Sequence, residues 1–351
     1  MAQLDVLFRE LITRQGSDLH LEEGRRPKLR VHGDLEEMAH SQVLDRDRLA
    51  GMLSEIAGQE RWEKFGECGD LDFAYAMGEE VRFRANYLRQ FTGLGAVFRI
   101  IPAKVLTLDG LGAPQIFKSF ADMQSGLVVV TGPTGSGKST TLAAILDHLN
   151  ATRRKKIVTI EEPVEFVHRC QQSLIIHREV GEDTASFPAG LQGALKSDVN
   201  VVLVGEMRDR ETIELALTAA EMGILVFGTL HTNSAAKTVD RIIDVFPAKK
   251  KNQIRSQLAN CLKGVVAQQL VKGADGGRRW AAHEILLNCS ALPGIIRSGE
   301  TIKLGSVMQT NRQAGMMTMD DCLLDLVKAG KVTLEAAYVK ALDKTRFRPG
   351  G

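Results

Sequence analysis

At 351 residues, with 44% hydrophobic and 25% charged side chains, the chain has the composition of a soluble globular protein with two domains or one large one. Its 45 Lys and Arg nearly balance its 43 Asp and Glu, so no overall positive charge favours a nucleic-acid partner. The N-terminus lacks the basic and apolar regions of a signal peptide, and no apolar run approaches the roughly 20 residues that span a bilayer. We therefore expect a cytoplasmic protein that binds no nucleic acid.

The cysteine pattern argues against a zinc site and against a disulfide framework. The five cysteines are scattered along the chain and form no C-x-x-C pair. We expect buried free thiols at Cys68, Cys170, Cys261, Cys289 and Cys322.

The first hundred residues predict a small domain that combines helices with a sheet. Leu4, Leu7, Phe8 and Leu11 have the spacing of an amphipathic helix, and a second helix is expected over 45–64. Strands are predicted over 17–21, 28–32, 69–75, 81–89 and 95–101. Pro102 ends this sheet, so we place the first domain at 1–107 and a linker rich in glycine and proline at 108–116.

The stretch at 126–140 has the form of a phosphate-binding loop. Leu127 to Val130 are apolar and mostly β-branched, as in a buried strand, and helical periodicity follows from Thr140. Residues 132–139 fit G-x-x-x-x-G-K-[ST], in which glycines let successive N–H groups point at phosphate oxygens at a helix N-terminus. We expect Lys138 to reach the β- and γ-phosphates and Ser139 to ligate Mg²⁺. The predicted nucleotide-binding residues are Gly132, Pro133, Thr134, Gly135, Ser136, Gly137, Lys138, Ser139 and Thr140.

Strands and helices alternate after this loop, with strands predicted over 156–160, 200–204 and 225–229. This order implies a parallel sheet with helices on both faces, whose ligand lies at the carboxyl ends of the strands. After Pro247 the pattern becomes mainly helical, and we assign 117–351 to this second domain. The helices expected there cover 250–266, 291–298, 318–329 and 333–341.

Two acidic sites follow strands at the edge where the ligand is expected. The segment 161–165 contains three glutamates after one strand, and Glu206 follows another. Hydrolysis of a bound nucleotide needs an acid that serves Mg²⁺ and one that polarises the attacking water. The two acidic sites and the phosphate-binding loop together predict hydrolysis of a bound nucleotide with Mg²⁺.

Six segments, distributed over nearly the whole chain, carry a family resemblance. They are Gly16-Ser-Asp-Leu-His-Leu21, the loop at 132–140, Thr159-Ile-Glu-Glu-Pro-Val-Glu-Phe-Val-His168, Val204-Gly-Glu-Met-Arg-Asp209, Gly228-Thr-Leu-His-Thr-Asn-Ser-Ala-Ala-Lys237 and Asp240-Arg-Ile-Ile-Asp-Val-Phe-Pro247. In these segments the chain resembles the PilT/PilU family of type IV pilus retraction ATPases, within the secretion ATPase superfamily. The resemblance implies an α/β protein in which a small PAS-like N-terminal domain precedes a RecA-like P-loop ATPase domain with C-terminal helices.

The resemblance also implies catalytic residues. The acidic box, the atypical Walker B strand and the histidine box of the family fall on 159–168, 201–206 and 228–237. Glu165 would polarise water, Glu206 would serve Mg²⁺ together with Ser139, and His231 would sense the γ-phosphate.

Arginines of the N-terminal sheet complete the implied site. The alternation of the strand at 81–89 places Arg82 and Arg84 on one face and apolar side chains on the other. By themselves, these arginines and Arg99 would form an exposed sheet face. The family uses arginines of this strand pair to reach the nucleotide phosphates, which makes Arg84 the first candidate and Arg82 and Arg99 the next.

The sequence departs from the family pattern in three places. Glu162 replaces a usual aspartate, and Ile224 replaces a usual histidine. The stretch at 291–300 lacks the arginine- and asparagine-rich helix linked to retraction, and its Pro293 and Gly294 are expected to disturb a helix interior. These differences leave ATP hydrolysis intact but bear on competence as a stand-alone retraction motor.

By resemblance, the chain works as a homo-oligomer, a hexamer, at an inner-membrane pilus platform, and converts ATP hydrolysis into pilus retraction and twitching motility. It would be a cytoplasmic protein attached to the inner membrane through its partners, one of which is a paralogous retraction ATPase. Two alternatives remain. The chain is either an accessory, PilU-like or regulatory nucleotide-binding partner of another motor, or a secretion or conjugation ATPase.

Overall fold

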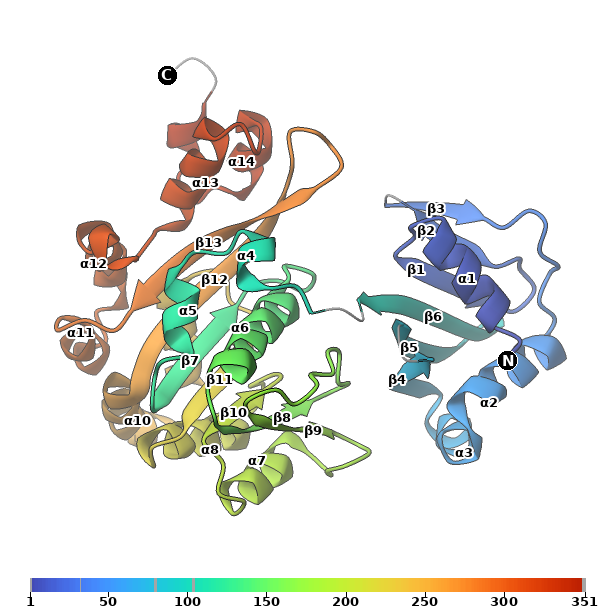
Figure 1. Ribbon diagram of the computed structural model, residues 1–351, viewed down its shortest axis with the longest axis horizontal. Helices are drawn as coiled ribbons and strands as arrows, with labels where there is room; N and C mark the ends of the chain where they lie inside the picture. Colours follow the sequence, from blue (N-terminus) through green and yellow to red (C-terminus); the bar gives the residue numbers. More distant parts are fainter. Residues whose placement is uncertain (1, 32, 79–80, 103–104, 349–351) are drawn as a thin grey trace. The chain divides into compact units, whose positions relative to one another are not determined.

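The computed structural model describes residues 2–31, 33–78, 81–102 and 105–348, which divide into two compact units (Figure 1). The first unit comprises Met1–Lys104 together with Glu162–Val167, and the second comprises Val105–Glu161 with His168–Gly351. His32, at the end of one predicted strand, lies outside the described residues. Among the helices of the described residues, none combines the length and the apolarity that crossing a bilayer requires.

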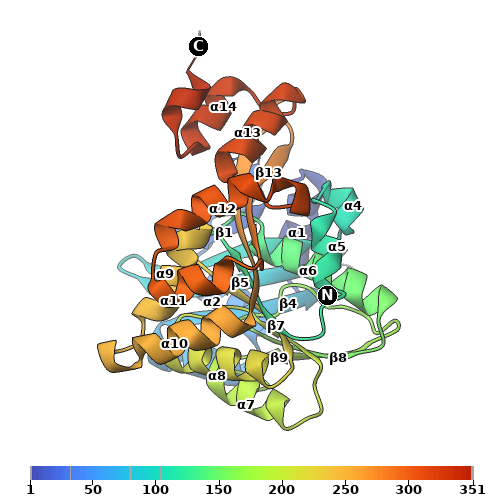
Figure 2. The same cartoon turned by 90° about the vertical axis from the view of Figure 1, so that its left-hand side faces the viewer.

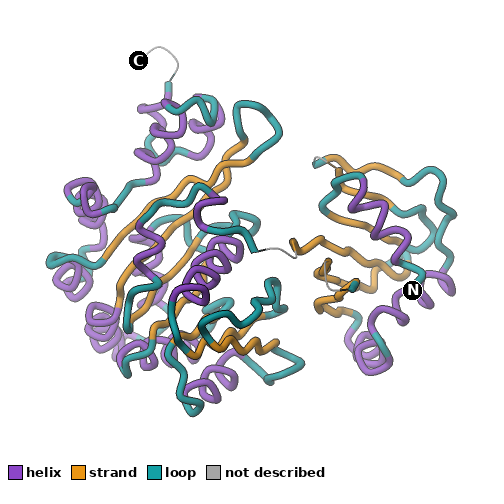
Figure 3. Tube along the Cα trace, viewed as in Figure 1, coloured by secondary structure: helices purple, strands orange, loops and turns teal. Residues whose placement is uncertain are grey.

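The first unit is a six-stranded antiparallel sheet, ordered β3-β2-β1-β6-β5-β4, with three helices. Figure 3 shows the helices and strands of this unit in different colours. Its elements are α1 (Asp5–Thr13), β1 (Asp18–Glu22), β2 (Lys28–Val31), β3 (Asp34–Glu37), α2 (Arg46–Ala57), α3 (Gln59–Cys68), β4 (Asp70–Met77), β5 (Val81–Gln90) and β6 (Gly93–Pro102).

Two features of this unit differ from the sequence prediction. The single helix expected over 45–64 is two helices, because Gly58 has a φ of +75° and ends α2 before α3 begins. The strand β3 was not predicted, since its residues Asp34–Glu37 include three acids and give no alternating apolar pattern.

The apolar face of α1 fixes the helix on the sheet. Leu4, Phe8 and Leu11 are fully buried, as their helical spacing predicts. The ring of Phe8 stacks on Phe83 of β5 at a centroid distance of 4.1 Å and meets Phe98 of β6 edge-on at 5.0 Å. Aromatic packing across two strands therefore holds the N-terminal helix in place.

The second unit is built on a seven-stranded sheet ordered β13-β12-β7-β11-β10-β8-β9. Every neighbouring pair is parallel except the edge pair β12 and β13. The strands are β7 (Gly126–Thr131), β8 (Lys156–Glu161), β9 (Leu174–Glu179), β10 (Val201–Val204), β11 (Leu225–Leu230), β12 (Leu262–Lys272) and β13 (Arg279–Leu287). The helices are α4 (Leu108–Leu111), α5 (Ile116–Phe120), α6 (Lys138–Thr152), α7 (Phe187–Leu195), α8 (Arg210–Glu221), α9 (Ala235–Asp244), α10 (Ala248–Cys261), α11 (Leu292–Ser298), α12 (Leu304–Thr310), α13 (Met319–Lys328) and α14 (Leu334–Lys340), with the 3₁₀ turns η1 (Thr301–Lys303), η2 (Arg312–Ala314) and η3 (Lys344–Phe347).

The core of the second unit is the middle of this sheet. All residues of β7, β10 and β11 are buried, as expected for parallel strands covered on both faces. The helix α6 connects β7 to β8 in one direction along the sheet, whereas α7, α8 and α9 lie in the connections from β9 to β10, β11 and β12 in the opposite direction. Because such crossovers are right-handed, α6 lies on one face of the sheet and the other three helices on the opposite face. Figure 2 shows α6 and α9 on opposite sides of the strands. The α/β fold expected from the sequence is confirmed.

The helix predicted over 250–266 ends at Cys261, and the chain continues as β12. Apolar residues such as Leu262, Val265 and Val266 fit a buried helix and a buried strand equally well. This segment forms a strand because it pairs with β7. The strand β9 was also not predicted. Residues 108–116, expected as a linker, include the short helix α4, whose Leu108 is buried in the core of the second unit.

Two further expectations were wrong. Pro293 does not disturb a helix interior, because it occupies the first turn of α11. The N–H groups of a first turn have no acceptor within the helix, so the missing N–H of proline costs no helical hydrogen bond there. All five cysteines are free, but only Cys261 and Cys322 are buried, whereas Cys68 and Cys170 are exposed and Cys289 is intermediate.

A prediction concerns the packing of α1. Phe8→Ala should lower the free energy of unfolding of the first unit by about 3–5 kcal/mol, because it leaves a cavity among aromatic rings. Denaturant titration in a Trp280→Phe background measures it, since Trp62 of α3 is then the one tryptophan that remains. Ile12→Ala, on the exposed side of the same helix, is the control and should change stability by less than about 0.5 kcal/mol. Equal effects of the two substitutions would contradict this packing.

Candidate functional site

The glycine loop joins β7 to α6 at the carboxyl end of the sheet, and its conformation requires glycine. Gly132, Gly135 and Gly137 have φ values of +147°, +76° and +88°. A Cβ on Gly132 would lie 2.3 Å from the carbonyl oxygen of Gln268 in β12, so no side chain fits there. The positive φ values curl the backbone into the concave shape that presents N–H groups to an anion.

Lys138, the first residue of α6, lies over this loop. Its Nζ donates to the carbonyl oxygens of Gly132 at 2.9 Å and of Pro133 at 3.2 Å. Pro133, Thr134 and Gly135 at the tip are exposed, whereas Ser136 is 3% exposed and its hydroxyl has no hydrogen-bond partner among the described residues. The loop therefore combines an ammonium group, an orphaned hydroxyl and a helix N-terminus, which suits a phosphate group.

Gln268 supports the loop and was not predicted from the sequence. Its side chain, 2% exposed, donates through Nε2 to the carbonyl oxygen of Ser136 at 2.7 Å and accepts from Oγ1 of Thr141 at 2.8 Å. It thereby ties β12 to the loop and to the first turns of α6. A glutamine inside the apolar run of β12 was the signal available, but the sequence could not show what it faced.

A network of threonine hydroxyls joins β7 to the segment after β11. Oγ1 of Thr131 accepts from the N–H of Thr232 at 2.9 Å and donates to its carbonyl oxygen at 2.7 Å. Oγ1 of Thr232 is in turn 2.7 Å from Oγ1 of Thr238 in α9. Since Thr131 directly precedes the glycine loop and Thr232 directly follows His231, this network sets the distance between the two functional segments.

Glu206 and His231, predicted from separate segments, are brought together. Nε2 of His231 lies 3.0 Å from Oε1 of Glu206, and Nε of Arg208 lies 2.6 Å from the same oxygen. Burial raises the pKa of Glu206, but hydrogen bonds from Arg208 and His231 and their charges outweigh it and hold the pKa below its usual value. Glu206 is therefore a carboxylate at neutral pH. Arg208 was not predicted from the sequence as a site residue, although it lies in the segment 204–209.

Glu165 and the three arginines lie in the first unit, because residues 162–167 group with it. There Nη1 of Arg84 lies 3.9 Å from Oε1 of Glu165, and Nη2 of Arg82 donates to the carbonyl oxygen of Val164 at 3.4 Å. Arg84 also makes a two-point contact with the carboxylate of Asp72 in β4.

Arg99, the third arginine, is held differently. Its Nε donates to Oδ1 of Asp18 at 2.7 Å, while 62% of the side chain stays exposed. The alternation predicted for the strand is as expected, since Phe83 and Ala85 are fully buried and the arginines at 82 and 84 lie on the other face.

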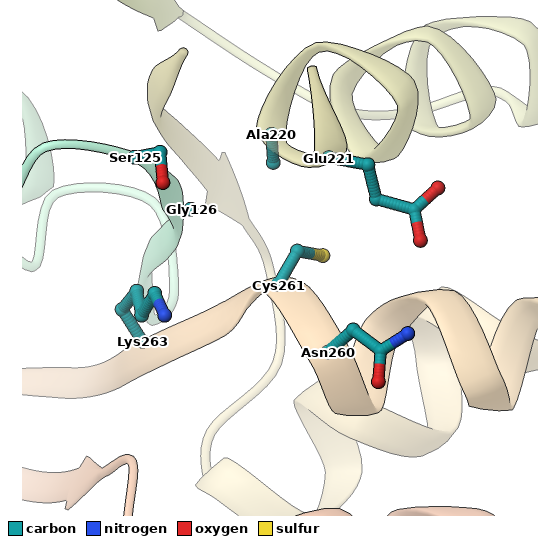
Figure 4. Close-up of a pocket in the computed structure, with 7 residues that line it drawn as sticks. All are labelled: Ser125, Gly126, Ala220, Glu221, Asn260, Cys261 and Lys263. Carbon is teal, nitrogen blue, oxygen red and sulfur yellow. The ribbon is translucent and has the colours of Figure 1, made fainter. Parts of the chain in front are cut away.

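A hollow of about 300 Å³ in the second unit lies away from these groups. It is lined by Ser125, Gly126, Ala220, Glu221, Asn260, Cys261 and Lys263 (Figure 4). Gly126 begins β7, so the hollow is at the amino end of the sheet, opposite the glycine loop. Its position separates it from the candidate site.

Comparison with known proteins agrees with the geometry. A model of the family described as "Type II/IV secretion system protein" matches residues 2–321. The type IV pilus retraction ATPase PilT of Pseudomonas aeruginosa is 48% identical over 93% of this chain and 94% of its own length. A twitching motility protein of Neisseria gonorrhoeae is 46% identical over 90% of this chain and 84% of its own. The crystal structure of the pilus retraction motor PilT with bound ADP superimposes with a TM-score of 0.89 at 38% identity, covering 99% of this chain and 98% of that one.

A prediction follows for the threonine network. Thr131→Val keeps the size of the side chain but leaves the N–H and the carbonyl oxygen of Thr232 without their partner. It should lower the free energy of unfolding of the second unit by about 1–3 kcal/mol. Denaturant titration in a Trp62→Phe background, followed by the fluorescence of Trp280, measures the change. Thr131→Ser keeps the hydroxyl and should retain most of the stability, so an equal loss in the two variants would contradict a role for these hydrogen bonds.

Proposed function

We propose that this chain, which belongs to the Type II/IV secretion system protein family, is a Mg²⁺-dependent ATPase that drives retraction of type IV pili and twitching motility. The observation that carries the proposal is the edge of the sheet in the second unit. There Thr131, which directly precedes the glycine loop, binds Thr232. The residue before Thr232 is His231, and its side chain contacts Glu206. Relatives named as a retraction ATPase and a twitching motility protein match nearly the whole chain and not only its nucleotide-binding core. This extent of similarity supports the same activity for this chain.

The glycine loop is the proposed binding site for the phosphates of ATP. Its N–H groups and the N-terminus of α6 provide partial positive charge, and Lys138 adds a full one. Lys138 would exchange the carbonyl oxygens of Gly132 and Pro133 for phosphate oxygens, which are stronger acceptors for an ammonium group. The unpaired hydroxyl of Ser136 gives the loop a further donor.

Ser139 and Glu206 are the residues proposed to hold Mg²⁺. The low pKa of Glu206 favours its charged form, and a hydroxyl and one carboxylate suit an ion that takes its remaining ligands from phosphates and water. The described residues contain no group of three or more His, Cys, Asp or Glu that could hold a metal by itself. When bound, the ion would neutralise charge on the phosphates.

Acid and base work is assigned to the remaining predicted residues. Glu165 is the proposed group that polarises the attacking water, and Nη1 of Arg84 lies 3.9 Å from its Oε1. His231 would follow changes at the γ-phosphate through its contact with Glu206. Arg84, and after it Arg82 and Arg99, would contribute positive charge to the transition state, as an arginine finger does.

The proposed working form is a ring of six copies that acts on an inner-membrane pilus platform protein. The family resemblance supports this form, together with a paralogous retraction ATPase as a further partner and attachment to the inner membrane through these partners. The expected disturbance of a helix by Pro293 was one reason for considering a regulatory role. That reason no longer applies, because α11 forms with Pro293 in its first turn. A secretion or conjugation ATPase remains the competing activity.

The first functional prediction concerns the phosphate contact. Lys138→Ala should abolish ATP hydrolysis, while circular dichroism and thermal melting stay close to those of the original protein, because the side chain serves the site and not the core. Lys249→Ala, an exposed lysine of α10, is the matched control and should hydrolyse ATP at the normal rate. Normal turnover in a folded Lys138→Ala protein would remove the phosphate-binding loop from the mechanism.

The second functional prediction concerns the two glutamates. Glu206→Gln and Glu165→Gln should each lower kcat by at least about 10²-fold, the scale for loss of general-base or electrostatic help, while nucleotide still binds. A coupled assay for released phosphate measures kcat, and calorimetry measures binding. Glu211→Gln, on an exposed position of α8, should leave both unchanged. If Glu161→Gln or Glu162→Gln were the damaging change instead of Glu165→Gln, the assignment within the acidic segment would be wrong.

A further inference from the structure

We propose that Glu284 is a positioning residue that transmits the nucleotide state from the loop 231–235 to the C-terminal helices of the second unit. These helices, α13, α14 and η3, pack with the end of the β12–β13 hairpin around their own apolar cluster, which we call the C-terminal cluster (Figures 1 and 2). Its buried members include Met319, Leu323 and Phe347. The inference rests on the proposed nucleotide binding.

Glu284 caps the helix that follows the histidine loop. It lies on β13, is 3% exposed, and its Oε1 accepts from the N–H of Ala235, the first residue of α9, at 2.7 Å. Ser234 caps a different N–H of the same helix, that of Lys237, at 3.3 Å. Since Ser234 already provides an ordinary helix cap, the carboxylate of Glu284 is an additional tie between β13 and the end of the loop 231–235.

The same stretch of β13 holds the start of α13. Glu284 stands between two residues of β13 that bind the segment 317–322, whose Met319 is the first residue of α13. On one side of it, the N–H of His283 donates to Sγ of Cys322 at 3.3 Å. On the other, Ile285 and Met317 exchange two backbone hydrogen bonds of 2.7 and 3.0 Å. The two residues of β13 that flank Glu284 thus bind the segment 317–322, and Glu284 between them binds α9.

A helix N-terminus faces the carboxylate of Glu284. No ion pair among the described residues involves Glu284, but α9 points the N–H of its first residue at Oε1. Burial raises the pKa of Glu284, as does the charge of Asp320, and the backbone hydrogen bond from Ala235 acts against this rise. Asp320 carries the connection further, since its carboxylate accepts from the N–H groups of Leu342 and Asp343 at 2.8 and 2.9 Å.

The loop 231–235 is therefore held from two sides. Thr131 binds the loop at Thr232, and Glu284 binds it at Ala235. Thr131 of β7 and Glu284 of β13 are both cross-strand neighbours of Ala267 in β12, so the three residues form one row across the sheet. Cross-strand neighbours in such a row point to the same face of the sheet. A shift of His231 toward or away from a bound nucleotide must move Ala235 against Glu284 or break their hydrogen bond, which displaces α13.

Trp280 can report such a displacement. It is packed against the C-terminal cluster, and Arg278 and Lys331 lie 4.1 and 4.4 Å from the centres of its rings, so small shifts change its surroundings. In full-length protein with Trp62→Phe, Trp280 is the one remaining tryptophan. Titration with ADP should change its emission with the same midpoint that calorimetry gives for binding.

The test is the same titration after Glu284→Gln, which keeps the volume but replaces an acceptor with an amide N–H₂. We expect an ADP affinity within about threefold of the original and an emission change at least about fivefold smaller. Glu335→Gln, an exposed position of α14, is the matched control and should keep the full response. An unaltered response in Glu284→Gln, or no response in the Trp62→Phe protein despite ADP binding, would overturn the inference. Failure to bind ADP would instead reject the proposed function and this inference with it.

A second measurement covers the case in which Glu284→Gln does not fold. Hydrogen exchange of the unsubstituted protein should show the N–H groups of Ala235 and Met319 changing protection together when ADP is added, because residues 283–285 of β13 bind both the start of α9 and the segment 317–322. A change at Ala235 with none at Met319 would contradict the connection.

Discussion

The hydroxyl of Thr131 makes the interaction on which the arrangement of the second unit depends. It binds both the N–H and the carbonyl oxygen of Thr232, so the end of β7 and the segment after β11 are fixed at the edge of the sheet. The glycine loop begins at the next residue after Thr131, and His231 is the residue before Thr232. A single side chain of a buried strand thus sets the distance between the phosphate-binding loop and the histidine that contacts Glu206.

The surrounding elements make this edge rigid. Gln268 of β12 holds the glycine loop, and Glu284 of β13 holds the start of α9. These two strands complete the site, although the start of β12 was predicted as helix and β13 was not predicted. The buried side chains of Gln268 and Glu284 are bound by backbone atoms and, for Gln268, also by the hydroxyl of Thr141, and such satisfied polar groups favour a unique geometry. A motor that couples hydrolysis to movement needs such defined connections between its nucleotide and its outer helices.

Much of this could be predicted from the sequence. The glycine loop could be predicted from its spacing and Glu206 from its position after a strand, whereas the roles proposed for Glu206 and His231 come from the family resemblance of their segments. The β12–β13 hairpin could not be predicted, because runs such as Leu262 to Val266 suit a helix and a strand equally until pairing with β7 decides. Gln268 and Glu284 were missed for the same reason, since their roles depend on partners more than 45 residues away in the chain.

If ATP hydrolysis at this edge drives pilus retraction, it removes pili from the cell surface. The most direct measurement is the number of surface pili, counted by electron microscopy, after deletion of the gene in its host and complementation with the original chain or with Lys138→Ala. Deletion should leave abundant pili on cells that no longer twitch, and the original chain should restore movement whereas Lys138→Ala should not. Loss of pili on deletion, or normal pili with normal twitching, would contradict it.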